Sequence, residues 1–157
     1  MDGSGPISSS GSNTSTAEGL QCALSSTLVA TAKAQTYHWN VTGPNFGSLH
    51  ALFEEIYTDL FAAQDHLAER LKAIGGHADG RPSGATALSV VEECDGRISA
   101  TAMVERLADD HRVLGRSFVV LAEKAEAEGD LVTHDLAVER AEIHDKFAWM
   151  LSAHLAG

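Results

Sequence analysis

The fold and the chemistry of this chain are decided by residues 38–70, which read HWNVTGPNFGSLHALFEEIYTDLFAAQDHLAER. The TGPN segment at 42–45 has the glycine, proline and asparagine of a turn. Before it, apolar and small residues recur three and four positions apart from Ala17 to about Val41. After it, the same spacing runs from about Gly47 to Ile74. This spacing is typical of an amphipathic helix, so the sequence predicts two long helices joined by a short turn.

The second half of the chain contains two more helical patterns. A third helix is expected from about Ser99 to Ala127, and a fourth from the turn at 128–130 to about His154. Trp149 is expected in the core. The inward face of the fourth helix is assigned to five apolar residues: Val132, Leu136, Ile143, Phe147 and Leu151.

A long crossover at residues 77–98 joins the two helical halves. Its Arg81-Pro82-Ser83-Gly84 segment predicts a loop, and Ala87 to Cys94 predicts a short helix. Four long helices with one long central connection are typical of a ferritin-like four-helix bundle. We therefore expect an all-α fold in which residues 17–157 form one ferritin-like domain. Residues 1–16, rich in Gly and Ser, are expected to form a flexible tail.

Composition narrows the classes of function. The 157 residues carry 11 basic and 22 acidic side chains, a formal net charge of −11, which attracts cations and repels nucleic acid. Cys22 and Cys94 are too few for a disulfide framework, which favours a reduced, cytoplasmic setting. We see no signal peptide and no apolar run near the ~20 residues of a membrane span, so no membrane association is expected.

Four potential metal ligands lie in phase on the second predicted helix. The turn angle is ~40° from His50 to Glu54, ~20° from there to Asp65 and ~40° from Asp65 to Glu69, so all four share one stripe. Imidazole and carboxylate ligands suit iron, manganese or zinc. A single such pair is typical of a solvated helix face, but two pairs in phase beside large apolar residues favour a metal site.

The two halves of this stripe are too far apart for one metal centre. His50 and Asp65 are separated by ~22 Å along a straight helix. An antiparallel partner helix across a two-fold axis would bring Asp65 and Glu69 of one chain opposite His50 and Glu54 of the other. His38, just before the turn, could then join His50. The spacing therefore favours a site shared between two subunits.

The same residues carry a family resemblance. The chain resembles the Dps family of mini-ferritins from about residue 17 to 155. The motifs that carry this resemblance are His38-Trp39-Asn40-Val41, Gly43-Pro44-Asn45-Phe46, Leu49-His50, Asp65 with Ala68-Glu69-Arg70, and Asp145-Lys146-Phe147 with Trp149.

The resemblance implies a hollow dodecameric cage that oxidises and stores iron. Its ferroxidase sites would each bind two iron ions, and Fe(II) would be oxidised by hydrogen peroxide, or more slowly by dioxygen, to an Fe(III) mineral that is stored harmlessly. A structural cage with a weak site or a zinc site is a further alternative. The implied catalytic ligands are His38, His50 and Glu54 from one subunit, and Asp65 and Glu69 from the other.

Further residues acquire roles through the resemblance. Glu126 and Asp135 match acids of an iron-entry pore, with Asp130 nearby, whereas Leu131 stands where a third acid is often found. Trp39 adjoins a ligand; packing at an interface is the favoured role, and electron donation to the site is the alternative. The remaining histidines are not expected to bind metal. His111 is expected at the surface, and four others are expected to be exposed or capping: His77, His134, His144 and His154.

Two competing functions are weighed against iron storage. A 24-subunit ferritin would use Glu-x-x-His pairs, and none of the eight histidines has Glu three residues before it. A nucleoid protein that binds and protects DNA is the alternative within the same family. Its members often use a basic tail, but residues 1–16 and 152–157 contain no Lys or Arg. Because phosphate binding depends on cations, direct DNA binding is not expected.

Overall fold

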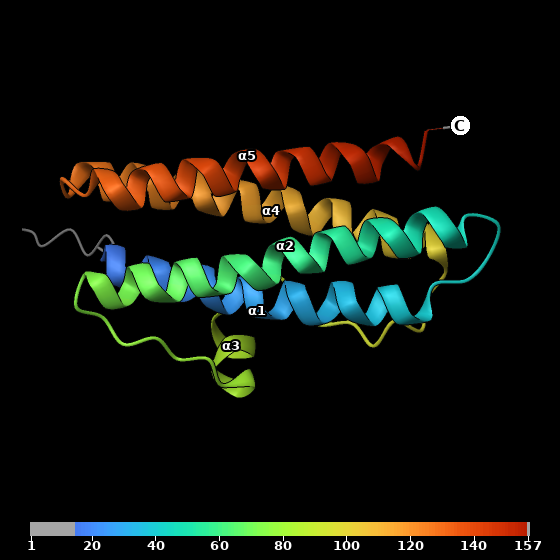
Figure 1. Ribbon diagram of the computed structural model, residues 1–157, viewed down its shortest axis with the longest axis horizontal. Coiled ribbons are helices and arrows are strands. Elements are labelled where there is room, and N and C mark those ends of the chain that lie inside the picture. Colours follow the sequence, from blue (N-terminus) through green and yellow to red (C-terminus); the bar gives the residue numbers. More distant parts are fainter. Residues whose placement is uncertain (1–14, 157) are drawn as a thin grey trace, which may run out of the picture.

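The computed structural model describes residues 15–156 and is all-helical over that range. Figure 1 shows four long helices and one short one. The predicted tail lies almost wholly outside the described residues, since 1–14 are not among them. No helix in the described range is long and apolar enough to cross a membrane. The helices are α1 (Thr16–Asn40), α2 (Phe46–Ala73), α3 (Pro82–Leu88), α4 (Ala100–Ala127) and α5 (Leu131–Ala153).

Side-chain caps explain where three of the long helices begin. The Ser15 hydroxyl accepts a hydrogen bond from the backbone N–H of Glu18 at 3.1 Å, so α1 starts one residue before its predicted start. Ser99 caps α4 in the same way. Asp130 caps α5 by accepting from the N–H of Thr133 at 2.9 Å. Each cap satisfies a backbone donor that has no partner inside the helix.

The long helices pack as two antiparallel hairpins, α1 with α2 and α4 with α5. The crossover after α2 runs along the bundle, so α2 and α4 point in the same direction (Figure 1). The apolar spacing predicted from about Gly47 to Ile74 is confirmed as the buried face of α2, except that Ile74 follows the last helical residue and is only partly buried. The buried apolar residues of α2 are Leu49, Leu52, Phe53, Ile56, Leu60, Ala63, Leu67 and Leu71.

The short helix of the crossover was predicted in the wrong place. It spans Pro82–Leu88, so three residues of the predicted loop form its first part, and most of the predicted helix at 87–94 is irregular. Pro82 occupies the first turn, where its missing N–H would have no partner in any case and its fixed φ already suits a helix. Proline here begins a helix instead of ending one.

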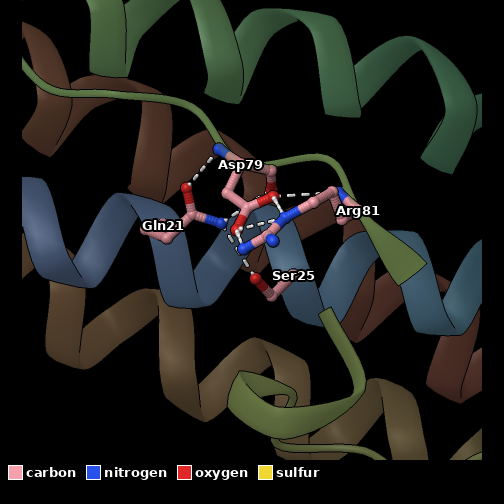
Figure 2. A network of polar contacts seen from close by, with 4 residues as sticks. All are labelled: Gln21, Ser25, Asp79 and Arg81. Carbon is pink, nitrogen blue, oxygen red and sulfur yellow. Dashed lines mark hydrogen bonds and ion pairs between the residues drawn. The ribbon is translucent and has the colours of Figure 1, made fainter. Parts of the chain in front are cut away.

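A polar network fixes the crossover to α1 (Figure 2). The Gln21 side chain accepts from the backbone N–H of Asp79 at 2.8 Å and donates to the Asp79 carbonyl at 3.0 Å. The Asp79 carboxylate pairs with the Arg81 guanidinium at 2.8 Å, and this pairing holds the pKa of Asp79 well below its usual range. The chain is thereby held against α1 just before α3 begins.

Most of the predicted inward face of α5 is confirmed: Phe147 and Leu151 are buried, and Leu136 and Ile143 pack partly buried against the core. Val132 and Trp149 are instead 62% and 68% exposed, and His144, predicted to be exposed or capping, is fully buried. His111 of α4, predicted at the surface, is buried as well, and its Nδ1 lies 2.8 Å from Nδ1 of His144. Of the other histidines outside the stripe, His77 and His154 are exposed as predicted, and His134 is half-buried.

Burial governs the ionisation of the two inner histidines. It is the main reason that the pKa of His111 falls to about 3 and that of His144 to about 2, and the nearby Arg140 charge lowers both further. Arg140 is itself buried and paired with Asp59 of α2 at 2.8 Å. Gly115 permits this close approach of α4 and α5, since a Cβ there would come within 2.9 Å of an Asp145 carboxylate oxygen. Because their pKa values are so low, the imidazoles of His111 and His144 are both neutral over the physiological pH range.

Candidate metal centre

The turn between α1 and α2 brings the first two candidate ligands together. His38 lies in the last turn of α1 and His50 in the first turns of α2. Gly43 adopts φ +108° between them, a conformation that side-chain-bearing residues rarely tolerate. The two imidazole rings stack with centroids 3.7 Å apart and planes 13° from parallel. The turn predicted from sequence thus creates a pair of adjacent imidazoles.

Reciprocal hydrogen bonds fix the protonation of these rings. Nδ1 of His38 lies 2.7 Å from the carbonyl oxygen of His50, and Nδ1 of His50 lies 2.7 Å from the carbonyl oxygen of His38. A carbonyl only accepts, so each Nδ1 must carry its proton and donate it. In the neutral form of each ring, Nε2 is then the nitrogen that has the lone pair. This is the arrangement found in metal-binding histidines, whose other ring nitrogen donates to a carbonyl or carboxylate.

Two aromatic rings hold the imidazoles from the sides. Phe46 stacks on His50 with centroids 4.9 Å apart. Tyr57 presents its edge to His38 at 5.2 Å and 77°. The sequence argument did not single out Tyr57, although its position seven residues after His50 places it near the same helix face. These contacts restrict the ring orientations.

The three carboxylates lie on the outward face of α2. Glu54, Asp65 and Glu69 are all exposed, and their stripe is centred roughly 150° around α2 from its buried face. α2 is one unbroken helix, so Glu54 stays far from Asp65 and Glu69 within one chain. Among the described residues, no three His, Cys, Asp or Glu side chains are close enough to hold a metal. Within one chain, the candidate ligands therefore lie in two separate groups, His38, His50 and Glu54 in the first and Asp65 and Glu69 in the second.

The outward face of α2 also carries unburied apolar area. Phe61 is 68% exposed and lies within ~20° of Glu54 on the helix circumference, between the two groups of candidate ligands. Phe61 and Asp65 line a groove of ≈ 550 Å³ that reaches Leu24 and Leu28 of α1. An exposed phenylalanine beside a groove is typical of a surface that is covered in an assembly.

The candidate pore acids have different surroundings. Glu126 and Asp135 are exposed near the α4–α5 turn. Asp130 is engaged within the chain, since it caps α5 through Thr133 and pairs with Arg70 at 2.9 Å. Partial burial opposes its ionisation, but these partners outweigh burial and hold the pKa of Asp130 below its ordinary value. The pore role of all three remains a prediction, as does that of Trp39, which is 68% exposed.

The bundle places this chain among the ferritin-like proteins, whose family model, described as a ferritin-like domain, matches residues 17–157. A "DNA protection during starvation protein" of Brevibacillus brevis is 35% identical over 130 residues, which cover 82% of this chain and 86% of that protein. The crystal structure of Dps from Staphylococcus aureus is 34% identical with a TM-score of 0.88, covering 90% of this chain and 95% of the other.

A further solved structure carries a description of its chemistry. A Dps protein from Vibrio cholerae, described as a member of a broad superfamily of ferritin-like diiron-carboxylate proteins, is 32% identical with a TM-score of 0.85. The match covers 89% of this chain and 88% of that one. This chain belongs to the Dps family.

Proposed function

We propose that this protein is a ferroxidase and iron store that oxidises Fe(II) at sites shared between two subunits of a cage. The observation that carries the proposal is the division of one in-phase ligand stripe on α2 into two half-sites, the first of which has two imidazoles with free Nε2 atoms. Neither half alone has enough ligands for two iron ions. Together they provide two nitrogen donors and three carboxylates, a set suited to iron.

A single two-fold axis would complete both sites at once. If the axis crosses α2 between Asp59 and Leu60, His50 faces Glu69 of the partner subunit, because those two positions are equally distant from the crossing point. Glu54 then faces Asp65 of the partner subunit for the same reason. The operation is isologous, so it generates two identical sites per dimer. One register therefore satisfies both ligand pairs.

The proposed chemistry uses iron as substrate. Each of two Fe(II) ions gives one electron, so one hydrogen peroxide takes up two electrons and two protons and becomes two water molecules without release of a hydroxyl radical. The carboxylates stabilise the harder Fe(III) product. The reciprocal Nδ1 hydrogen bonds keep both imidazoles oriented during turnover. Dioxygen is the slower alternative oxidant.

Mixed dimers test the shared site. His50→Ala and Glu69→Ala subunits should each be inactive alone. In a mixed dimer, one site loses both residues, but the other keeps both. With random 1:1 assembly, about one quarter of all sites should be intact and about one quarter of the wild-type rate of Fe(II) oxidation should return. A site contained in one chain would give no recovery.

A matched mixture controls for nonspecific rescue. His50 and Glu54 belong to the same half-site, so mixing His50→Ala with Glu54→Ala subunits leaves every mixed site with one defect. No activity should return. Recovery in this mixture, or no recovery in the first, would disprove the shared site. Light scattering of both mixtures must show the same assembly as wild type.

The proposed cage has twelve subunits, as the family resemblance implies. Exposed apolar side chains support extensive contacts between subunits: Phe61 on α2 and Val132 and Trp149 on α5 are each more than half exposed in the single chain. Multi-angle light scattering at micromolar concentration should give the mass of a dodecamer. A monomer under these conditions would contradict both the cage and the shared site.

We propose that protection comes from iron chemistry and not from direct DNA binding. The formal charge of −11 per chain opposes contact with phosphate, and lowering the salt would strengthen that repulsion. Gel-shift assays with plasmid DNA at low salt, with a chelator to remove bridging divalent ions, should give no retardation. Retardation by the intact cage would support the DNA-binding alternative.

A further inference from the structure

A second group of reactive side chains lies away from the α2 stripe, where the end of the crossover meets α1 and α4. We name it the Cys94 cluster; it consists of Lys33, Tyr37, Cys94, Arg106 and Asp110. Lys33 is buried, pairs with Asp110 at 2.7 Å and donates to the Glu92 carbonyl at 3.0 Å. The Arg106 guanidinium lies 3.6 Å from the Cys94 sulfur.

The surroundings of Cys94 favour the thiolate. Burial opposes ionisation, but the Tyr37 hydroxyl, the backbone N–H of Gly96 and the charges of Arg106 and Lys33 together outweigh it, so the pKa of Cys94 lies below its ordinary value. The thiolate is the nucleophilic form of cysteine. A cation next to a partly exposed thiol is typical of reactive cysteines, and here that cation is the Arg106 guanidinium at 3.6 Å.

The sulfur is accessible through a small groove. Cys94 is partly exposed and lines a groove of ≈ 260 Å³ whose polar side chains are Lys33, Thr36, Glu93 and Asp95. A water molecule occupies roughly 30 Å³ in the liquid, so an oxidant not much larger than water enters easily.

The Tyr37 hydroxyl supplies independent evidence for a ligand at this place. Tyr37 is fully buried, and its hydroxyl lies next to the Cys94 thiol, where it favours the thiolate; no described group makes a regular hydrogen bond with this hydroxyl. A buried O–H donor without a partner is unfavourable. An oxygen atom bonded to the Cys94 sulfur would give this hydroxyl an acceptor.

The other cysteine lacks these features. Cys22 is also partly exposed, but its thiol donates a hydrogen bond to the Leu88 carbonyl at 3.4 Å, which uses the protonated form. Among the described residues, no cation is bonded to its sulfur. Cys22 is therefore an internal control for exposure alone.

We propose that Cys94 is a peroxide-reactive thiol that is reversibly oxidised to a sulfenic acid. The thiolate attacks one oxygen of hydrogen peroxide, so an S–O bond forms and the O–O bond breaks. The sulfur loses two electrons to the peroxide, and the leaving hydroxide takes a solvent proton to become water. Arg106 offsets the negative charge that moves from sulfur to the leaving oxygen. An added thiol reduces the sulfenic acid through a mixed disulfide.

The test uses the intact protein, freed of metal with a chelator so that iron oxidation plays no part. After one equivalent of hydrogen peroxide, a dione reagent that traps sulfenic acids should label Cys94 and not Cys22, as read by peptide mass spectrometry. Label should be absent in Cys94→Ser and unchanged in Cys22→Ser. Equal labelling of both cysteines, or labelling of Cys22 alone, would overturn the proposal.

A second variant tests the role of the positive charge. Arg106 is exposed, so Arg106→Gln should fold normally, and it should slow labelling of Cys94 by about tenfold because less thiolate is present. An unchanged rate in a folded Arg106→Gln cage would count against the proposed activation. Fe(II) oxidation by metal-loaded Cys94→Ser should equal that of wild type, which separates this thiol chemistry from the proposed ferroxidase.

Discussion

Two pairs of neighbouring histidines occur in this bundle, and they use their ring nitrogens differently. In the α1–α2 pair, both Nδ1 atoms donate to backbone carbonyls, which leaves both Nε2 atoms as the nitrogens that could bind a metal. In the α4–α5 pair, the two Nδ1 atoms share one proton with each other, and Nε2 of His144 is buried without a partner.

The difference indicates why the outer pair, and not the inner pair, suits a metal ion. Proximity alone is insufficient, because both pairs are close. The outer pair has its Nδ1 hydrogen bonds satisfied by the backbone and belongs to a stripe with acidic side chains, so its remaining nitrogens suit a cation. The inner pair lies between Phe118 and Phe147 beside the Arg140 charge. A cation there would face repulsion and no carboxylate ligand, so we assign this pair a role in stability.

The largest expected effect separates the two pairs by activity. His50→Ala should lower the initial rate of Fe(II) oxidation about 100-fold, since losing even a residue that supports a metal ligand typically costs 10- to 100-fold. His144→Ala should leave the rate per folded subunit unchanged. Stopped-flow oxidation assays with peroxide measure both. If both variants lost the same fraction of the oxidation rate while both cages stayed intact, the two histidine pairs would not have the separate roles assigned to them.

The second prediction separates the pairs by stability. His144→Ala should lower the free energy of unfolding by about 2 kcal/mol, because it leaves a cavity and an unpaired His111 Nδ1. Chemical denaturation at fixed protein concentration measures this change. His50→Ala should cost far less, as His50 is only half-buried.

A double variant provides the control for this stability effect. Replacing His111 and His144 together by Leu removes both polar partners, so stability should recover most of the loss. A double variant less stable than His144→Ala would show that the imidazole pair contributes through specific packing and not through its hydrogen bond.

The third prediction uses pH. The pKa values of about 3 for His111 and about 2 for His144 lie below the unfolded value of about 6.5, so the unfolded chain binds more protons between these limits. The contribution of these neutral rings to the free energy of unfolding is therefore fully present above about pH 6.5, and it decreases as the pH falls below that value. Below that pH, the free energy of unfolding should fall by up to about 1.4 kcal/mol per pH unit for each ring.

Other groups titrate in the same range, so the comparison must be made against the double Leu variant. The difference in stability between wild type and that variant should change steadily from pH 7 to pH 5, in the direction that disfavours wild type in acid. A difference independent of pH would mean that the inner histidines are hydrated or ionised in the folded cage.

Sequence patterns predicted α2 well because its two faces are chemically distinct. Its apolar residues recur with helical spacing on one side, and His50 and the carboxylates lie on the other, so both the core and the candidate ligands followed from periodicity. The separation of the half-sites followed from the helical rise alone. Tyr57 was missed because a tyrosine near a core face carries no sign that it will contact His38.

The bounds of α5 and most of its apolar inward face were predicted correctly, but its polar burial was not, because that face is mixed. Thr133, Arg140 and His144 are buried there, while Val132 and Trp149 are exposed. Each polar residue is buried only because another helix supplies its partner, as Asp59 does for Arg140 and His111 for His144. Such partners lie far away in sequence and cannot be read from the spacing of one helix. The exposed apolar residues point to subunit contacts outside the single chain.

The smallest expected effects come from the aromatic ring stacked on each pair. Phe46, 46% exposed, stacks on His50 of the outer pair, and Phe118, 1% exposed, stacks on His144 of the inner pair. Phe46→Leu should loosen the orientation of His50 and lower the oxidation rate about twofold, with a stability change within about 0.5 kcal/mol. Phe118→Leu should cost about 1 kcal/mol of stability and leave the oxidation rate unchanged. The two variants make the same chemical change, so each controls for the other in parallel oxidation and denaturation measurements. Loss of oxidation in Phe118→Leu at full assembly would mean that the inner pair is coupled to the metal site, and the two pairs would then no longer have separate roles.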